Sequence, residues 1–163
     1  GVKMTAPDKE CTEEMKAYIH DLNAMYRSCP ALYAMDGNSD GFEWIQFTNY
    51  DENIVAFLRK TEKMEETLLI VCNFSPVSYD SYQVGVPFAG KYKEIFNSDN
   101  GKYGGLGVVN TRAKNAVHAE CDNRENSLKM KLPAYGVTVF SCTPEKKVSS
   151  VKRVGKKVKI SRK

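Results

Sequence analysis

The first part of the sequence has the apolar pattern of a single amphipathic helix. Thr12 is a favourable N-cap, and Glu13 and Glu14 follow it in the first turn, where negative charge suits the helix dipole. The segment should end at Cys29, because the residue before Pro30 is pushed out of helical geometry. Apolar side chains recur between these ends at spacings of three and four, at Met15, Ile19, Leu22, Tyr26 and Cys29. One helix with one apolar stripe needs a sheet, or a missing partner, against which to pack.

From position 42 onward the apolar period changes to two, which is typical of β-strands. Residues 67–74 are almost continuously apolar, as expected for a central strand that is buried on both faces. Seven or eight short strands with turn signals between them favour an antiparallel β-sandwich. The expected strands are 42–47, 54–59, 67–74, 82–86, 90–96, 116–119, 128–132 and 137–141.

The length and the distribution of charge narrow the picture further. A chain of 163 residues can hold one domain but not a (β/α)₈ barrel, which usually needs about 200 residues or more. The net charge of +4 is concentrated at one end, because residues 145–163 contain nine lysines and arginines and one glutamate. That segment carries +8, which leaves −4 on residues 1–144. We expect a mildly acidic folded part and a basic tail, residues 144–163, that is disordered or loosely extended.

The basic tail could bind nucleic acid or another anionic surface. It lacks the interleaved aromatic residues of single-strand binders, so a solubilising or incidental role is favoured and nucleic acid is an unlikely partner. The longest compact apolar run, residues 68–72, is far shorter than the roughly 20 residues that span a bilayer. Residues 1–8 lack the hydrophobic segment of a signal peptide and are interpreted as a linker or chain start. A cytoplasmic location without membrane association is expected.

No arrangement typical of a metal site is visible in the sequence. Zinc sites usually contain closely spaced ligand pairs, whereas the only histidines are His20 and His118 and no two cysteines are separated by two residues. We therefore expect neither a metal nor another cofactor. The cysteines are interpreted as free thiols in a reducing compartment; they are Cys11, Cys29, Cys72, Cys121 and Cys142.

The candidates for catalysis are equally weak. Nothing in the sequence pairs any two of the prominent carboxylates, which are interpreted as solvated; they are Asp21, Asp36, Asp40, Glu43 and Glu94. The glycine-rich segment 104–107 lacks the strand–loop–helix context of a nucleotide loop and is interpreted as a flexible surface loop. No catalytic residue is assigned.

Aromatic side chains offer a further possibility, because pyranose rings pack well on flat aromatic faces. Aromatic residues on half-buried strands usually fill or cover the core, and this is the general interpretation here. Tyr79 and Tyr103 are the best candidates for contact with a glucan, because both are expected to lie in loops.

Several segments resemble bacterial glycogen branching enzymes, which belong to the α-amylase superfamily, glycoside hydrolase family 13. Residues 21–32 (DLNAMYRSCPAL) resemble the family segment DLN-x-x-YR-x-x-PAL, and residues 41–45 resemble GFEWI. Four later blocks are similar to further family segments in the same order and with similar gaps, at 71–77, 82–87, 90–99 and 127–133. Any one block is weakly specific, but the colinear set covers about residues 12–142.

The resemblance implies a function for the longer parent protein. Family members cut an α-1,4 glucan chain and rejoin it through an α-1,6 bond, with one carboxylate as nucleophile and a second as acid and base. Those carboxylates lie upstream of anything in this chain, so the fragment alone is expected to be inactive. Its implied partners are α-glucan, through the parent enzyme, and the missing catalytic barrel.

The resemblance also implies a domain organisation. Residues 9–30 would be the last helix of the (β/α)₈ barrel, and residues 31–143 the carboxy-terminal all-β domain. The β-domain is expected to buttress the barrel through Leu22, Tyr26, Phe42 and Trp44, with Met15, Leu22 and Tyr26 exposed or covered by the β-domain or a partner. The alternative is a free-standing, non-catalytic carbohydrate-binding β-sandwich, which would have no use for an exposed helical stripe.

Overall fold

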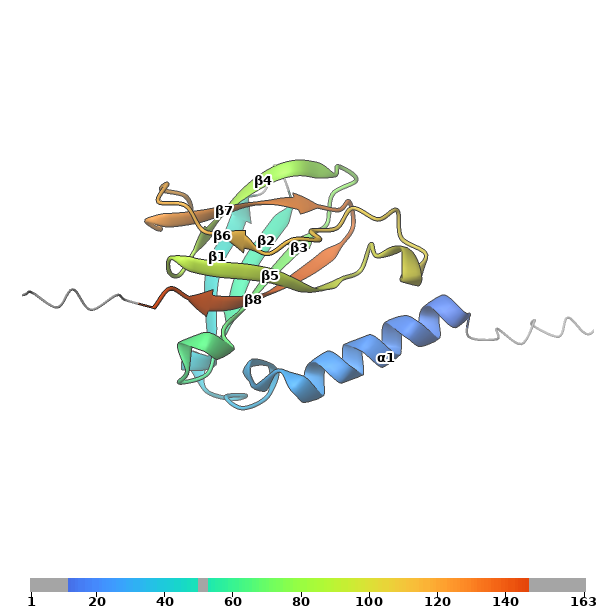
Figure 1. Ribbon diagram of the computed structural model, residues 1–163, viewed down its shortest axis with the longest axis horizontal. Coiled ribbons are helices and arrows are strands. Elements are labelled where there is room, and N and C mark those ends of the chain that lie inside the picture. The colour runs from blue at the N-terminus through green and yellow to red at the C-terminus, as the bar shows by residue number, and fades with distance from the viewer. Residues whose placement is uncertain (1–11, 50–52, 147–163) are drawn as a thin grey trace, which may run out of the picture.

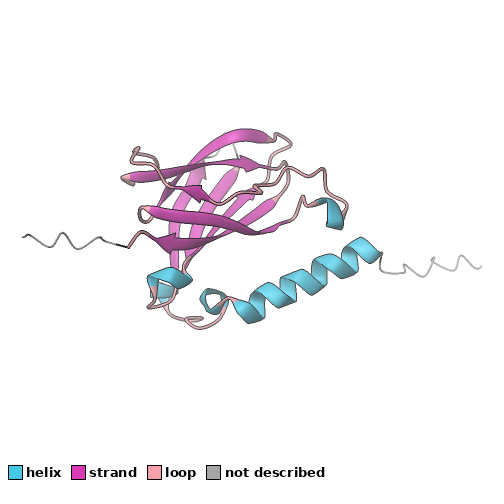
Figure 2. Ribbon diagram, in the orientation of Figure 1, coloured by secondary structure: helices cyan, strands magenta, loops and turns pink. Residues whose placement is uncertain are grey.

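The computed structural model describes residues 12–49 and 53–146, and it shows two antiparallel sheets with a helix beneath the larger one (Figures 1 and 2). The predicted linker at residues 1–8, and the predicted basic tail beyond residue 146, lie outside the described residues. The main elements are α1 (Glu13–Ser28), β1 (Phe42–Asn49), β2 (Ile54–Arg59), β3 (Leu68–Asn73), β4 (Tyr79–Val86), β5 (Gly90–Asn97), β6 (Lys114–Asn115), β7 (Asn126–Leu132) and β8 (Val137–Pro144). Short 3₁₀ turns are η1 (Pro30–Leu32), η2 (Ser39–Gly41), η3 (Met64–Glu66) and η4 (Gly101–Tyr103).

The ends of α1 are those that the sequence predicts. The Thr12 hydroxyl accepts a 3.2 Å hydrogen bond from the Met15 amide, which satisfies one of the free N–H groups of the first turn. At the other end Cys29 has an extended backbone, and Pro30 begins η1. Both predicted boundaries are confirmed.

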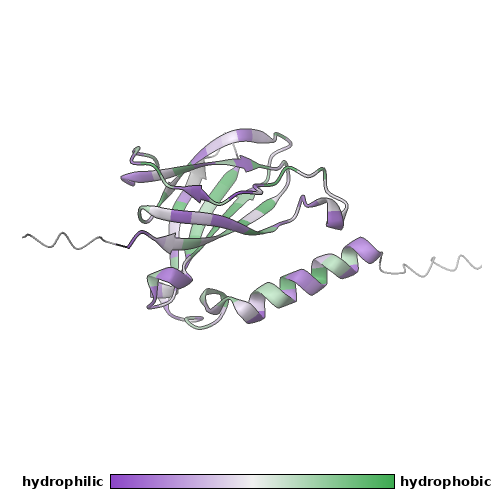
Figure 3. Cartoon of the chain, viewed as in Figure 1, coloured by the Kyte–Doolittle hydropathy of each residue, from purple (hydrophilic) through white to green (hydrophobic). Residues whose placement is uncertain are grey.

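The two sheets form the predicted antiparallel sandwich. The larger sheet has the strand order β1-β2-β3-β8-β5-β6, and β4 pairs with β7 in the smaller one. The main core lies between the sheets and is built from side chains such as Leu58, Leu69, Val84, Met130 and Phe140, all of which are buried. Hydropathy follows this arrangement, with apolar residues on the strands that face the core and interrupted apolar segments along α1 (Figure 3).

A second apolar cluster lies on the other face of the larger sheet, between the sheet and α1. Its buried members are Ala31, Leu68, Ile70, Phe96 and Val139. From α1, Tyr18, Leu22 and Met25 pack against them. The central strand β3 is consequently buried on both of its faces, as its apolar sequence predicts.

The strand expected at 116–119 and the loop expected at Tyr79 both need correction. The weak strand expected at 116–119 is wrong: β6 is Lys114–Asn115, which pairs with β5, while Val117 forms an isolated bridge with Ser127. The chain moves here from the edge of one sheet to the edge of the other, so neither pairing continues.

Tyr79 does not lie in a loop as expected. It is the first residue of β4, because it pairs with Leu132 ahead of an irregularity in the strand that precedes Tyr82. No helix in the described ranges is long and apolar enough to cross a membrane.

Candidate functional site

The four residues predicted to contact a barrel all lie on the side of the larger sheet that carries α1. Leu22 packs into the second cluster, so the β-domain covers it. Tyr26 is 51% exposed, and its ring lies 5.7 Å from that of Tyr33. Trp44, on β1, is 49% exposed and contacts Phe57 edge-to-face at 5.8 Å.

Phe42, the fourth of these residues, connects the aromatic side chains of β1 and β2. Its ring stacks on that of Phe57 at 5.2 Å and meets that of Trp44 edge-to-face at 4.9 Å. The register explains the grouping, because Trp44 lies opposite Phe57 in the β1–β2 pair and opposed residues project from the same face. The three rings form one aromatic group at the β1 edge of the sheet.

The other exposed apolar side chains of this region come from α1 and the turn after it. Met15 and Ile19 are each about half exposed, at 50% and 48%, and Tyr33 is also exposed. We call Met15, Ile19, Tyr26, Tyr33, Phe42, Trp44 and Phe57 together the apolar face. Exposed apolar patches of this kind commonly mark interaction sites.

A polar clasp fixes α1 to the sheet on the side away from the apolar face. The Tyr103 hydroxyl donates a 2.5 Å hydrogen bond to Asp21 Oδ2, and Lys102 Nζ lies 2.6 Å from the same oxygen. Hydrogen bonds from Lys102, Tyr103 and His20, the largest contribution being that of Lys102, hold the pKa of Asp21 well below its usual range. The same contact raises the pKa of Lys102. Asp21 is therefore ionised and paired at neutral pH.

Tyr103 therefore has a structural role. Its ring meets that of Tyr18 on α1 edge-to-face at 5.2 Å and lies 5.8 Å from that of Phe96 on β5, so Tyr103 packs at the junction between α1 and the sheet. The residue ends η4 rather than lying in an irregular loop. Tyr79, the other predicted glucan contact, is half-buried against the main core, with its ring 5.1 Å from that of Tyr82. The structure does not bring these two tyrosines together.

A second clasp fixes the corner after α1. Arg59 on β2 donates hydrogen bonds to the carbonyl oxygens of Ala31 and Leu32, at 3.2 and 3.3 Å, and pairs with Asp36 at 2.6 Å. These bonds satisfy carbonyl groups at the end of the helical segment that have no helical partner. The turn that follows α1 is thereby fixed to β2.

The carboxylates interpreted as solvated are mostly engaged in structural contacts, which corrects that interpretation. Glu43 accepts from Lys60 at 2.7 Å and from Arg124 at 2.6 Å, and these two hydrogen bonds lower its pKa. Glu94 Oε2 accepts from both the backbone and the side chain of Asn110. Each carboxylate joins segments that are distant in sequence, which no local pattern could reveal.

The glycine-rich segment is shaped by Asp99, a residue that the sequence did not single out. Its two carboxylate oxygens accept from the amides of Leu106 and Val108, at 3.1 and 2.9 Å. Gly105 passes so close to the Asp99 carbonyl that a Cβ atom there would lie 2.1 Å from the oxygen. The sequence signal that could have indicated this role is an aspartate that follows a strand and precedes several glycines.

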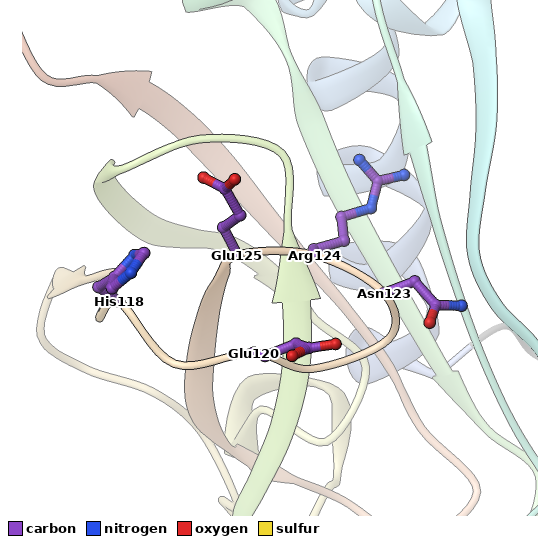
Figure 4. Close-up of a pocket in the computed structure, with 5 residues that line it drawn as sticks. All are labelled: His118, Glu120, Asn123, Arg124 and Glu125. Atoms are coloured by element: carbon purple, nitrogen blue, oxygen red, sulfur yellow. The ribbon is translucent and has the colours of Figure 1, made fainter.

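An open polar pocket of about 320 Å³ lies around the turn between β6 and β7 (Figure 4). Its lining side chains come from one short stretch of chain: His118, Glu120, Asn123, Arg124 and Glu125. Arg124 is already paired with Glu43, and four of the five residues are exposed. The pocket brings no nucleophile next to a base.

The described part of the chain gathers no set of metal ligands, and two of its thiols have pKa values raised far above neutral pH. No group of three or more histidine, cysteine, aspartate or glutamate side chains is placed there to hold a metal ion. Burial raises the pKa of Cys121 to about 11, with Asp122 adding to the effect, and that of Cys142 to about 12. These thiols stay protonated at neutral pH and are poor nucleophiles.

Comparison with known proteins identifies relatives of this chain. Residues 44–143 match the family described as alpha amylase, C-terminal all-beta domain. The chain is 40% identical over 129 residues to the 1,4-alpha-glucan branching enzyme GlgB of Oceanobacillus iheyensis, a match that covers 79% of this chain and 20% of the relative. The enzymes of the same name from Synechococcus elongatus and Bacillus cereus (strain Q1) are 44% identical over 119 residues and 36% over 151. These matches cover 73% and 90% of this chain and 15% and 23% of the relatives, so the chain spans about a fifth of the length of the curated proteins it matches.

Proposed function

Because the chain belongs to the alpha amylase C-terminal all-beta domain family, we propose that it is the terminal β-domain of a 1,4-α-glucan branching enzyme and that it supports the catalytic barrel. The parent enzyme would cut α-1,4 glucan chains and rejoin them as α-1,6 branches. Its two catalytic carboxylates would lie in the barrel, so the β-domain alone would be inactive. The parent would act in the cytoplasm, in glycogen synthesis.

The apolar face carries this proposal. The face consists of aliphatic and aromatic side chains that are partly exposed to water. Covering them would lower the free energy by roughly 25 cal/mol for each Å² of apolar surface removed from water. Met15, Ile19 and Tyr26 continue the apolar stripe of α1 beyond the part that the sheet covers. Such a helix, with one side on the sheet and the next side open, fits the position between a β-domain and a barrel.

The domain boundaries follow from the same reasoning. In this proposal residues 9–30 form the last helix of the barrel and residues 31–143 form the β-domain. The clasps at Asp21 and Arg59 support a fixed geometry between these two parts. A rigid junction of this kind would let the β-domain hold the final helix in place.

The alternative of a free-standing carbohydrate-binding sandwich finds less support. Tyr79 and Tyr103, the best candidates for stacking on a sugar, both have their rings packed against other aromatic side chains. A contact between glucan and the exposed edges of these two rings stays a prediction. Glucan retention by Tyr79→Ala and Tyr103→Ala variants of the complete enzyme tests it.

The proposed function is tested in the complete enzyme by placing charge on the apolar face. The double variant Ile19→Asp, Tyr26→Asp should lower branching activity at least tenfold and lower the thermal midpoint, because two carboxylates would be buried against the barrel. The control is Val117→Asp, since Val117 is equally exposed but lies on the β6–β7 connection. Unchanged activity and midpoint in the double variant would exclude the supporting role.

A further inference from the structure

A groove of about 490 Å³ lies at one end of the sandwich, between η2, η3 and the connection from β4 to β5. We call it the end groove. Its apolar lining consists of Met35, Met64, Pro87 and Phe88. None of these residues belongs to the apolar face, so the proposed contact with a barrel leaves the end groove unexplained.

The end groove is acidic in effect, because its cations are already paired. Glu43 accepts hydrogen bonds from both Lys60 and Arg124, at 2.7 and 2.6 Å. The other two carboxylates of the lining are those of Asp40 and Glu62, which are exposed and form no ion pair within residues 12–49 and 53–146. Two unpaired carboxylates beside apolar walls suit an occupant that carries both cationic and aliphatic side chains.

The acidic surface continues from the end groove into the polar pocket of Figure 4. Arg124 lines both hollows, and the pocket adds the carboxylates of Glu120 and Glu125. The two linings together hold five carboxylates against Lys60 and Arg124, so they carry a charge of −3 while His118 is neutral. A cationic segment that entered the end groove would meet further negative charge next to it.

The chain itself leaves β8 at the rim of the end groove. The Glu145 amide donates a 3.0 Å hydrogen bond to the carbonyl oxygen of Ala89, and Pro144 is the register partner of Gly90. Phe88, which precedes Ala89, is part of the groove lining. In Figure 1 the end of β8 lies at the same end of the sandwich as η3 and the start of β5. The basic segment therefore follows directly from a residue beside the groove.

The first part of the basic segment has side chains of the two kinds that the end groove suits. Residues 147–154 contain three cations, three valines and no carboxylate: Lys147, Lys152, Arg153, Val148, Val151 and Val154. At about 3.3–3.6 Å per residue, five residues span roughly 17 Å, so the segment is long enough to extend across the groove. A short connection also gives the segment a high effective concentration at the groove, so weak individual contacts are sufficient.

We infer that residues 147–154 occupy the end groove, with cationic side chains against Asp40 and Glu62 and a valine against the apolar lining. The charges of the two parts are complementary, since residues 1–144 carry −4 and residues 145–163 carry +8. The basic tail would then be held against its own domain, and its cations would be withheld from nucleic acid and other anionic surfaces. The inference does not depend on the proposed function, because the groove and its occupant both belong to this chain.

Photo-crosslinking in the full 163-residue chain tests this inference. The photoreactive amino acid benzoylphenylalanine, which reacts preferentially with methionine side chains, replaces Val151, and mass spectrometry identifies the crosslinked peptides. We expect reaction mainly at Met35 or Met64, with little at Met15, which is 50% exposed but lies near the start of α1. In about 1 M salt, where the Debye length is about 3 Å, the crosslink yield should fall roughly threefold or more.

A pair of matched variants separates charge pairing at the groove from a general charge effect. Asp40→Asn, Glu62→Gln should lower the yield at Met35 or Met64 by a factor similar to that of salt. The control Glu14→Gln, Asp80→Asn removes the same charge from exposed positions at the starts of α1 and β4, and it should leave the yield unchanged.

Four results would overturn the inference. The first two are equal reaction at Met15, Met35 and Met64, and no reaction at the two groove methionines. The third is crosslinking only between different copies of the chain, which a mixture of isotope-labelled and unlabelled protein reveals. The fourth is a yield that neither salt nor the groove variant changes.

Discussion

The phenol of Tyr103 donates a 2.5 Å hydrogen bond to the carboxylate of Asp21, across 82 positions of sequence. This bond joins the middle of α1 to the loop that follows β5. Since Lys102 pairs with the same oxygen, the helix is held by charge as well as by apolar packing. Helix α1 is therefore fixed to the β-sandwich by polar as well as apolar contacts.

Removing the Tyr103 hydroxyl should loosen the helix. We expect Tyr103→Phe to lower the free energy of unfolding by about 1 kcal/mol, the usual net value of one hydrogen bond. Urea denaturation measures the change. Tyr135→Phe is the control, because Tyr135 is 71% exposed, and a control that loses as much stability as Tyr103→Phe would contradict the assignment.

The clasp should also make stability depend on pH in a defined direction. The folded-state pKa of Asp21 lies below its ordinary value of 3.8, so the stabilisation is complete above about pH 4 and is lost as the pH falls toward the folded-state pKa. The thermal midpoint of the wild type should consequently fall more steeply between pH 5 and pH 2.5 than that of Asp21→Asn. Parallel pH profiles for the two proteins would show that Asp21 is not the responsible group.

Gly105 should tolerate replacement by alanine far less well than Gly101, which lies four residues earlier in the same connection. In Gly105→Ala the new methyl group would lie 2.1 Å from the Asp99 carbonyl oxygen, so backbone must move, at an expected cost of roughly 2 kcal/mol or more. Gly101→Ala meets nothing within 4 Å and should change stability by less than about 0.5 kcal/mol. Urea midpoints of the two variants provide the comparison, and equal midpoints would refute the close approach.

Trp44 should contribute less to the stability of this chain than a core aromatic residue does. Phe140 is fully buried, so Phe140→Ala should cost about 3–5 kcal/mol. Trp44 is half exposed, and Trp44→Ala should cost about half as much, roughly 2 kcal/mol. In the complete enzyme the cost at Trp44 should rise toward that of Phe140, because the barrel would cover the ring. Equal costs in the chain and in the complete enzyme would indicate that Trp44 stays exposed.

The sequence predicts the architecture well because its local periods report burial directly. Alternation along 128–132 and the nearly continuous apolar run at 67–74 indicate which faces are buried, and both strands are confirmed, as β7 and as β3 with bounds Leu68–Asn73. The failure at 116–119 has a physical cause. Within that segment Ala116 bonds to Gly90 of β5 and Val117 bridges to Ser127 of β7, so no two successive residues pair with the same strand and no strand forms.

The surroundings of the candidate site residues were harder to predict than the strands, because they depend on contacts between segments that are distant in sequence. Tyr103 was selected for an expected exposure, yet its ring is packed between Tyr18 and Phe96. The roles of Asp21, Arg59 and Asp99 follow from partners that are far away in sequence or from backbone groups, and residue type alone does not predict them. The exposed stripe of α1 was foreseen, since one helix on one sheet could not cover all of its apolar side chains.

The order of strands has a consequence for synthesis on the ribosome. Leu69 of β3 pairs with Phe140 of β8, so 71 further residues must be synthesised before this central strand can pair with its second neighbour. At roughly 5–20 residues per second, this delay is about 4–14 s. During that time β3 presents an unpaired edge with the sequence Leu-Leu-Ile-Val-Cys, the kind of apolar, uncharged segment that associates between chains. We expect the nascent chain to require chaperone protection during this interval.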